Sequence, residues 1–310
     1  MGLGRAQAVT GVVDVERLGF TLPHEHLFLR MWANDGRGGM EQAADEEVLL
    51  EELTAFRRLG GMSLLDLTPR GCGRDPLAAR RLSQESGLTI IMGCGWYTEP
   101  YYPPEDALAR RSVNAIADQL VAEIEEGIDG TGVRPGVIGE IGVSQGWLSP
   151  LEERVHRAVA RAHRRTGLAI ITHTQHAAAG FAQLEVFEEE GVDLRRVCVG
   201  HCDSQPYLDY CVAIAARGAF VAFDNIGLQM GQLEDRLVHL IKALVEQGLA
   251  EHVLLSHDVG QTSELRTFGG RGFTYLSELF LPKLRAAGLS EALIEQLTVV
   301  NPQRLIAAVS

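Results

Sequence analysis

Short apolar runs alternate with longer amphipathic segments along almost the whole chain, and this alternation constrains the fold more than any other feature. Eight runs are predicted to be strands: residues 21–27, 62–68, 89–95, 136–143, 169–174, 197–202, 219–224 and 253–258. Most are continuously apolar, as expected for parallel strands that are buried on both faces. Eight such strands, interleaved with helical segments, predict an α/β fold of the (β/α)8 TIM-barrel type.

Three of the intervening segments carry clear helix signals. Residues 149–166 begin with Ser149 and Pro150, an N-cap residue followed by proline at the first helical position, and Gly167 follows as a C′ residue. Segments 45–59 and 112–126 repeat apolar residues at helical spacing. A doubly wound open sheet is the alternative, but no Gly-x-Gly-x-x-Gly turn follows the first strand to favour it.

Residues 1–310 are expected to form a single domain, because no linker rich in Pro, Gly or Ser divides them. Within the first 20 residues, we expect a small hairpin across the barrel floor. The formal net charge of −13 argues against a nucleic-acid-binding surface. No apolar run approaches the ~20 residues of a membrane span, and the N-terminus lacks an apolar core of signal-peptide type. The five cysteines are odd in number and irregularly spaced, which predicts reduced, buried thiols and a cytoplasmic protein.

Charged and imidazole side chains recur in or at the ends of five predicted strands. They are His24 and His26 in the first, Glu140 in the fourth, His173 in the fifth, His201 in the sixth and Asp258 in the eighth. In a barrel the C-terminal strand ends converge on the face where active sites of this fold lie. These six side chains are therefore expected to meet there.

The pair His24 and His26 can reach one metal, because residues i and i+2 of a strand point to the same side while Glu25 points away. Taken alone, His173 and His201 are more typical of hydrogen-bonded core histidines, and Asp258 fits the N-cap of the last helix. Burying all six without partners would be costly, and two divalent cations would supply those partners. Imidazole and carboxylate ligands suit zinc best, with manganese or iron also possible.

Other histidines contrast with this set. His156 and His163 lie in a predicted helix among many charged neighbours, and are expected to be solvated. His257 points opposite to Asp258 if the eighth strand runs that far, and it is left out of the predicted site.

Motifs along nearly the whole chain resemble the phosphotriesterase-related family of the amidohydrolase superfamily. The matching segments are TLPHEH, DLTPRGCGRDP, GCGWYTEPYYP, GVIGEIGVS, THTQ, RVCVGHCDS, VAFDNIG, LLSHD and NPQRL. The resemblance implies that His24, His26 and Asp258 bind the more buried of two metals, and that His173 and His201 bind the more exposed one. It also implies a small-molecule substrate and, in view of other members, a possible homodimer.

The chain departs from the phosphotriesterases proper and the lactonases at two points. Their fourth strand carries a carboxylated lysine that bridges the metals, but here Glu140 is the available carboxylate and neither Lys242 nor Lys283 is near. The chain therefore resembles the glutamate-bridged branch, some of whose members are similar to amide-bond hydrolases. The lactonases also carry an arginine after the aspartate of the seventh strand, where this chain has Asn225.

Substrate contacts are expected from the loops at 96–111, 225–236 and 259–275. Tyr97 matches a tyrosine that lies beside the metals in relatives. We predict it as a catalytic and substrate-binding residue, together with substrate contacts from Trp96, Asn225 and Arg271. Ordinary packing at the rim is the alternative for the two aromatic residues. The loop 259–275 is rich in glycine and arginine, and either a mobile lid with a cationic group or a solvated loop fits that composition.

The leading hypothesis is hydrolysis of a carboxylic amide, ester or lactone by a hydroxide that bridges the two metals. Asp258 would accept the proton, and Tyr97 would stabilise the developing oxyanion. Phosphoester hydrolysis at the same site is a second hypothesis. A metal-containing small-molecule-binding protein with little turnover is a third, from a different class.

Overall fold

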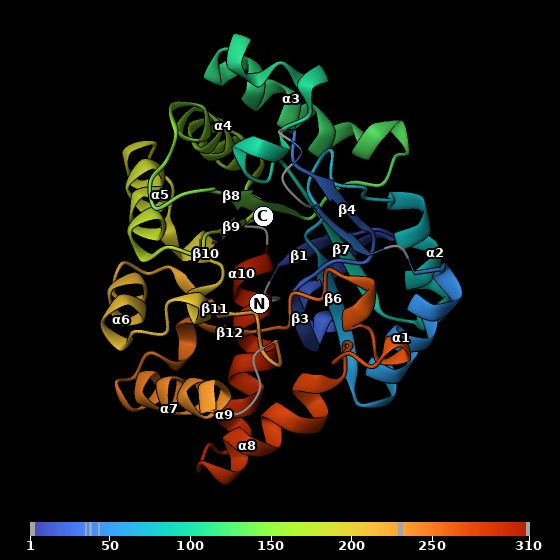
Figure 1. Cartoon of the computed structure of the whole chain (residues 1–310), viewed down its shortest axis with the longest axis vertical. Coiled ribbons are helices and arrows are strands. Elements are labelled where there is room, and N and C mark those ends of the chain that lie inside the picture. Colours follow the sequence, from blue (N-terminus) through green and yellow to red (C-terminus); the bar gives the residue numbers. More distant parts are fainter. Residues whose placement is uncertain (1–3, 35, 37–38, 43, 229–231, 308–310) are drawn as a thin grey trace.

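The computed structural model describes residues 4–34, 36, 39–42, 44–228 and 232–307. Eight parallel strands form one sheet that curls into a barrel, with helices around it (Figure 1). In sequence order the strands are β3 (Phe20–Glu25), β6 (Gly61–Asp66), β7 (Thr89–Cys94), β8 (Val137–Gly142), β9 (Ile170–His173), β10 (Val197–Val199), β11 (Phe220–Phe223) and β12 (Val253–Leu255). All eight predicted strands are therefore confirmed, as is the single-domain α/β barrel.

Helices follow the barrel strands and pack around them, except that the last helix places Leu305 and Ile306 in the apolar cluster of the barrel interior. They are α1 (Glu46–Arg58), α2 (Pro76–Ser86), α3 (Val113–Glu126), α4 (Pro150–Thr166), α5 (Ala177–Glu189), α6 (Leu208–Ala216), α7 (Gln232–Glu246), α8 (Leu281–Ala286), α9 (Glu291–Glu295) and α10 (Asn301–Ile306). The predicted start of α4 is confirmed: Ser149 and Glu152 form a capping box, and Gly167 ends the helix with φ 73°. Residues 229–231 of the expected substrate loop lie outside the described part.

The barrel closes between its first and last strands. The backbone N–H of Asp258 donates to the carbonyl of His24 over 3.1 Å, and the N–H of His26 donates to the carbonyl of Val259 over 3.0 Å. These bonds lie just beyond the last residues of β12, at the C-terminal ends of both strands. Closure therefore places Asp258 beside His24 and His26, although more than 200 residues separate it from these two histidines in the sequence.

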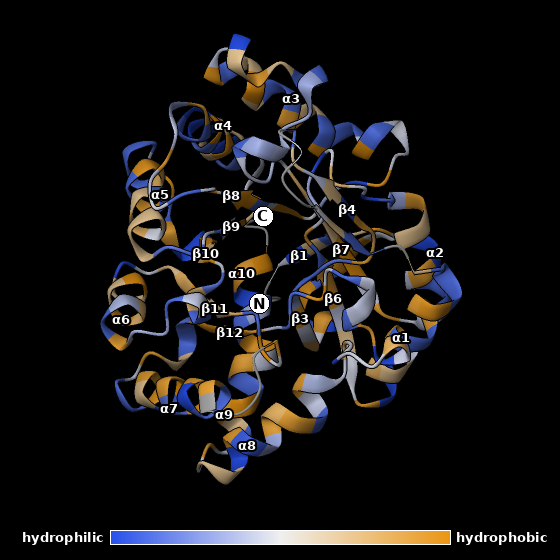
Figure 2. Ribbon diagram, viewed as in Figure 1, coloured by the Kyte–Doolittle hydropathy of each residue, from blue (hydrophilic) through white to orange (hydrophobic). Residues whose placement is uncertain are grey.

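Two large apolar clusters fill most of the molecule, and a small third one groups Leu29, Met31 and Cys72. The larger lies between the strands and the surrounding helices, whose outer faces are polar (Figure 2). The smaller fills the barrel interior with residues such as Leu65, Ile91 and Ile171, and includes Ala6 and Ala8. The latter two belong to β1 (Arg5–Ala8), which pairs with β2 (Gly11–Asp14) in an antiparallel hairpin. Through Ala6 and Ala8 this hairpin packs against the N-terminal end of the barrel interior.

A second antiparallel hairpin lies between the first barrel strand and the first helix. Strands β4 (Leu29–Trp32) and β5 (Gly39–Gln42) pair after β3. The five cysteines are free and buried, as predicted. In the portion of the chain that the structure describes, no helix combines the length and the apolarity that crossing a membrane requires.

Candidate metal centre

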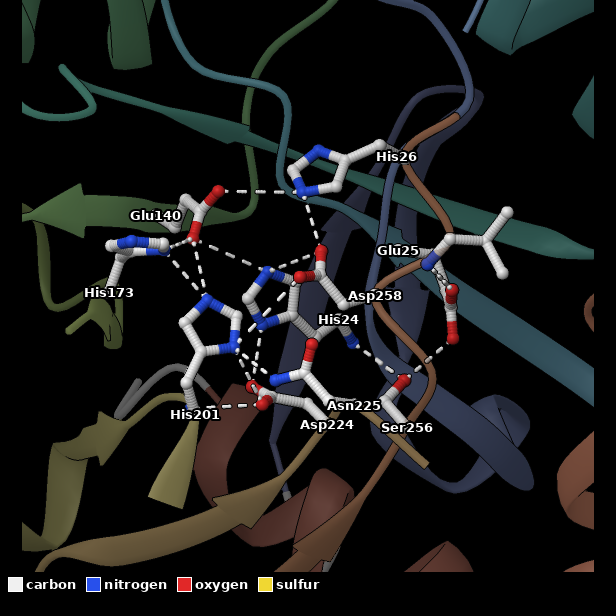
Figure 3. Close-up of polar contacts among 12 residues, drawn as sticks. His24, Glu25, His26, Glu140, His173, His201, Asp224, Asn225, Ser256 and Asp258 are labelled. Atoms are coloured by element: carbon white, nitrogen blue, oxygen red, sulfur yellow. Dashed lines mark hydrogen bonds and ion pairs between the residues drawn. The ribbon is translucent and has the colours of Figure 1, made fainter. Parts of the chain in front are cut away.

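The six predicted ligands meet at the C-terminal end of the barrel (Figure 3). They come from five strands or the residues directly after them: His24 from β3, His26 just after β3, Glu140 from β8, His173 from β9, His201 just after β10 and Asp258 just after β12. All are buried except Asp258, whose side chain keeps 23% of its surface exposed. The structure thus brings together every residue that was predicted as a metal ligand.

The carboxylate of Glu140 lies between two groups of histidines. Its Oε1 is 3.4 Å from Nε2 of His26. Its Oε2 is 2.9 Å from Nδ1 of His173, and 3.5 Å from Nε2 of both His24 and His201. One carboxylate therefore faces all four imidazoles with both of its oxygens.

Two sets of ligand atoms converge on this carboxylate. On one side, Oδ1 of Asp258 lies 3.1 Å from Nε2 of His26 and 3.5 Å from Nε2 of His24. On the other side, Nδ1 of His173 and Nε2 of His201 are 2.7 Å apart. Nitrogen and carboxylate ligands at such spacing are typical of sites for divalent transition metals.

Asp224 fixes the protonation of two of the histidines. This fully buried residue follows β11, and its Oδ2 is 2.7 Å from Nδ1 of His24 while its Oδ1 is 2.9 Å from Nδ1 of His201. An ionised carboxylate only accepts hydrogen bonds, so both Nδ1 atoms carry a proton, and the Nε2 atoms that face Glu140 are the ones left to bind a metal. Nε2 of His24 is buried without a hydrogen-bond partner. A buried ring nitrogen without a partner in that position fits a metal ion.

His26 is oriented in the same way by a different chain of contacts. Its Nδ1 lies 3.1 Å from Oγ1 of Thr68, whose hydroxyl donates to Oδ1 of Asp66 over 2.6 Å. The Nδ1 of His26 is therefore the donor, and its Nε2, which faces the cluster, is the atom left to bind a metal. Sequence reasoning assigned no role to Asp66, Thr68 or Asp224. All three are polar residues at the ends of predicted strands, and this position could have marked them as part of the site.

Glu25 points away from the cluster, as predicted, and braces the segment around Asp258. Its Oε1 accepts hydrogen bonds from the hydroxyl of Ser256 (2.8 Å), and from the backbone N–H (3.0 Å) and Nδ1 (2.8 Å) of His257. Its Oε2 accepts from the N–H of Val259 over 2.9 Å. The middle residue of the His-Glu-His motif therefore holds the chain on both sides of Asp258.

Two of the cluster residues have a strained backbone. His201 and Asp258 both have a φ of 55°, a left-handed backbone conformation that residues other than glycine rarely adopt. Such strain persists only where surrounding contacts impose it, and it is concentrated at functional sites.

The electrostatics of the cluster require compensating positive charge. Burial opposes ionisation of His24, but the charges of Asp224 and Asp258 raise its pKa well above the ordinary value. Burial likewise opposes ionisation of His26, yet its contacts with Asp258 and Glu140 raise its pKa to about 9. Burial also penalises the Glu140 carboxylate, but the neighbouring imidazoles hold its pKa well below normal. Carboxylates that face one another need positive charge between them. Metal ions supply that charge when they displace the protons of the imidazoles.

A cavity of about 280 Å³ lies beside the cluster. Its lining includes Tyr97, His173, Tyr101, Gln145 and Gln175. The hydroxyl of Tyr97 is 3.1 Å from Nε2 of His173, the ring nitrogen that faces away from Glu140. Burial raises the pKa of Tyr97 well above its usual range, and so does the charge of Glu140. The hydroxyl thus stays protonated, and it is placed to donate to a ligand in this cavity.

The other three predicted substrate contacts do not line the cavity beside Tyr97. Asn225 lines a smaller cavity of about 180 Å³, and its Nδ2 is 3.1 Å from Nδ1 of His201. Trp96 is only 1% exposed, and its indole N–H donates to Oδ2 of Asp106, so that the structure does not bring it to either cavity. Arg271 is also buried, and its guanidinium contacts backbone carbonyls and Glu264.

The predicted solvation of His156 and His163 is wrong, because both are buried. Nδ1 of His156 donates to the carbonyl of Glu152 over 2.7 Å, and its Nε2 lies 3.1 Å from the amide of Gln183. That amide also donates to the backbone carbonyl of His173. The helix α4 turns this face toward the barrel, so His156 packs behind the cluster. Burial lowers its pKa to about 4 and keeps it neutral.

Comparison with known proteins identifies the family. The model of the Phosphotriesterase family matches residues 4–306. The chain belongs to the phosphotriesterase family. This confirms the resemblance found in the motifs, and Glu140 takes the bridging position of the glutamate branch. The chain is a hydrolase of this family, built around a buried cluster of histidines and carboxylates of metal-binding type.

Three similar proteins illustrate the range of the phosphotriesterase family. The Phosphotriesterase homology protein of Escherichia coli is 36% identical over 288 residues, which cover 92% of this chain and 97% of the relative. Its crystal structure, complexed with phosphate in the active site, matches with a TM-score of 0.88. The N-acetyltaurine hydrolase of Homo sapiens is 27% identical over 97% of both chains. A resiniferatoxin-binding protein from Rhodobacter sphaeroides is 34% identical with a TM-score of 0.92, over 98% of this chain and 95% of the other.

Proposed function

We propose that the protein is a binuclear-metal hydrolase that cleaves a carboxylic amide, ester or lactone. The observation that carries this proposal is the position of Glu140, whose two oxygens face His26 on one side and His173 on the other. A single carboxylate between two sets of nitrogen ligands is suited to bridge a pair of divalent cations.

Each cation has its own ligands in this proposal. His24, His26 and Asp258 would hold the more buried ion, and His173 and His201 the more exposed one, with the Glu140 carboxylate shared between them. Nitrogen and oxygen ligands favour zinc, and manganese or iron suit the same set.

The chain's own residues would support hydrolysis as follows. Bound divalent cations lower the pKa of water and polarise a substrate carbonyl. Asp258 is the best proton acceptor among the carboxylates of the cluster: its side chain is 23% exposed, against 5% for Glu140 and 0% for Asp224, so a proton can leave toward the substrate. Tyr97 would donate a hydrogen bond to the oxygen that becomes negative.

The bond that is cleaved is proposed from two observations. Glu140 replaces the carboxylated lysine of the phosphotriesterases proper, as the glutamate branch implies. The human relative is an N-acetyltaurine hydrolase, which by its name cleaves an amide. Both favour a carboxylic substrate over a phosphotriester for this chain.

Two other relatives keep the alternatives specific. The Escherichia coli relative was crystallised with phosphate in its active site, which favours phosphoester hydrolysis as a second candidate. The Rhodobacter sphaeroides relative is described as resiniferatoxin-binding, which favours the third candidate, a binding protein with little turnover.

Metal analysis combined with a substrate panel tests the proposal. Purified protein supplied with zinc or manganese is analysed for metal, then assayed on lactones, N-acyl amino acids, aryl esters and phosphotriesters. About two metals per chain, with metal and activity both lost in Glu140→Ala, are expected. Glu234→Ala is the control, because Glu234 is equally buried but pairs with Lys283 instead. Folded protein that takes up no metal would refute the proposal, and activity confined to phosphotriesters would favour the second candidate.

A further inference from the structure

The loop at 259–275 folds tightly around one arginine. Only 3% of the Arg271 side chain is exposed. The glycines on either side make this possible: a side chain at Gly270 would collide with the backbone of Glu264, and one at Gly272 with the side chains of Glu52 and Arg266. The glycines and arginines of this loop had suggested either a mobile lid or a solvated loop. In the structure the loop encloses the buried guanidinium of Arg271.

The guanidinium of Arg271 joins the ends of two barrel strands. Its Nη2 donates to the carbonyl of Asp258, just beyond β12, over 3.2 Å. Its Nη1 donates to the carbonyl of Ile226 over 3.3 Å, and more weakly to that of Asn225 at 3.5 Å, just beyond β11. One side chain therefore ties the segment that carries Asp258 to the segment that follows Asp224.

Glu264 balances the buried charge and holds the connecting turn. Its Oε1 lies 3.1 Å from Nη2 of Arg271. Its Oε2 accepts hydrogen bonds from the backbone N–H of Gly260 over 2.8 Å and of Gln261 over 3.0 Å. A buried arginine without such a partner would be strongly destabilising. The ion pair thus anchors Arg271 to the residues directly after Asp258.

Asp258 is the residue that most needs such an anchor. Its backbone is in the left-handed conformation, which must be imposed by its surroundings. Its N–H is held by the carbonyl of His24, and its carbonyl is held by Arg271. Together these contacts set the direction in which the carboxylate points, toward Nε2 of His24 and His26.

We propose that Arg271 is a positioning residue for Asp258. It clamps the Asp258 carbonyl to the end of β11, and so keeps the strained backbone in the conformation that aims the carboxylate at the cluster. This rests on the proposed function in so far as Asp258 acts as a metal ligand. A substrate contact is disfavoured, because both Nη atoms bind groups of the protein and neither cavity beside the cluster is lined by Arg271.

The test compares Arg271→Met with Arg266→Met. Arg266 belongs to the same loop but is 46% exposed, and it contacts Thr274 and Glu278 instead of a strand end. Hydrogen exchange of peptides covering 24–26 and 256–261 is measured on metal-free protein, followed by zinc affinity in chelator competition and by kcat and KM. Arg271→Lys is included because it keeps the charge and some donors, and it should be intermediate.

Arg271→Met is expected to raise exchange in these peptides about tenfold, since their protection depends on local opening. It should lower zinc affinity by roughly 10–100-fold, the usual effect of losing a residue that orients a ligand. Arg266→Met should change neither. A raised KM with unchanged exchange and affinity would overturn the proposal in favour of a substrate contact. Lower thermal stability alone would leave Arg271 a merely structural residue. If wild-type protein takes up no zinc, the proposed function fails, while metal-free exchange still decides whether Arg271 holds the Asp258 segment.

Discussion

Replacing Asp224 with asparagine tests how the cluster is built. Asp224 accepts hydrogen bonds from Nδ1 of His24 at one oxygen, and from Nδ1 and the backbone N–H of His201 at the other. Asparagine has one accepting oxygen, and the two donors of His201 should keep it. The amide NH2 then faces His24. The imidazole of His24 must move its proton to Nε2, the atom that faces Glu140 and Asp258.

The size of the effect follows from the lost contact. A hydrogen bond to a charged acceptor contributes about 1.5–3 kcal/mol. At about 1.4 kcal/mol per factor of ten, Asp224→Asn should weaken metal binding by roughly 10–150-fold. The loss should fall on the ion held by His24, His26 and Asp258, while the ion held by His173 and His201 is largely retained.

Competition with a chromogenic chelator measures this affinity, and elemental analysis gives the number of ions retained. Asp203→Asn is the matched control, because Asp203 is also buried beside the cluster but accepts its hydrogen bonds from Asn225. Circular dichroism and thermal unfolding establish that both variants are folded. Wild-type affinity for both ions in folded Asp224→Asn would refute the argument that this carboxylate sets the histidine tautomers.

Three further predictions concern single residues. Tyr97→Phe should lower kcat by roughly 10²-fold with metal content unchanged, as for loss of one oxyanion donor; unchanged kinetics would exclude Tyr97 from the reaction. Glu25→Gln should lower the free energy of unfolding by about 1–3 kcal/mol in urea titrations, because an amide cannot accept all four hydrogen bonds; wild-type stability would contradict the bracing role. His156 has a folded pKa of about 4, below the usual 6.5, so its contribution favours folding above pH 6.5 and is lost as pH falls toward 4. Between pH 6.5 and pH 4, the free energy of unfolding should change by about 3 kcal/mol less in His156→Gln than in wild-type protein. Identical pH profiles would show that His156 is not held neutral.

Much of the fold could be read from local pattern. Apolar runs buried on both faces predicted each barrel strand, and Ser149 with Pro150 predicted the start of α4. The period of two residues along a strand put His24 and His26 on the same side and Glu25 on the other. These features depend on a few neighbouring residues, and a linear sequence records them directly.

Contacts across the barrel could not be read in this way. Asp224 lies 200 residues from His24, and which strand end it would meet depended on how the barrel closes. The same closure placed Glu25 against residues on both sides of Asp258.

Burial was the second feature that sequence alone left open. The charged neighbours of His156 suggested solvent, and the glycines around Arg271 suggested a mobile or solvated loop. Yet α4 turns His156 toward the barrel, and the loop folds over Arg271. The sequence by itself determined the barrel strands, three of the helices and the residue types at the strand ends, because these follow from local periodicity. The tertiary structure alone decided which carboxylate orients which histidine and which arginine is enclosed, because those contacts form only when distant strand ends are brought together.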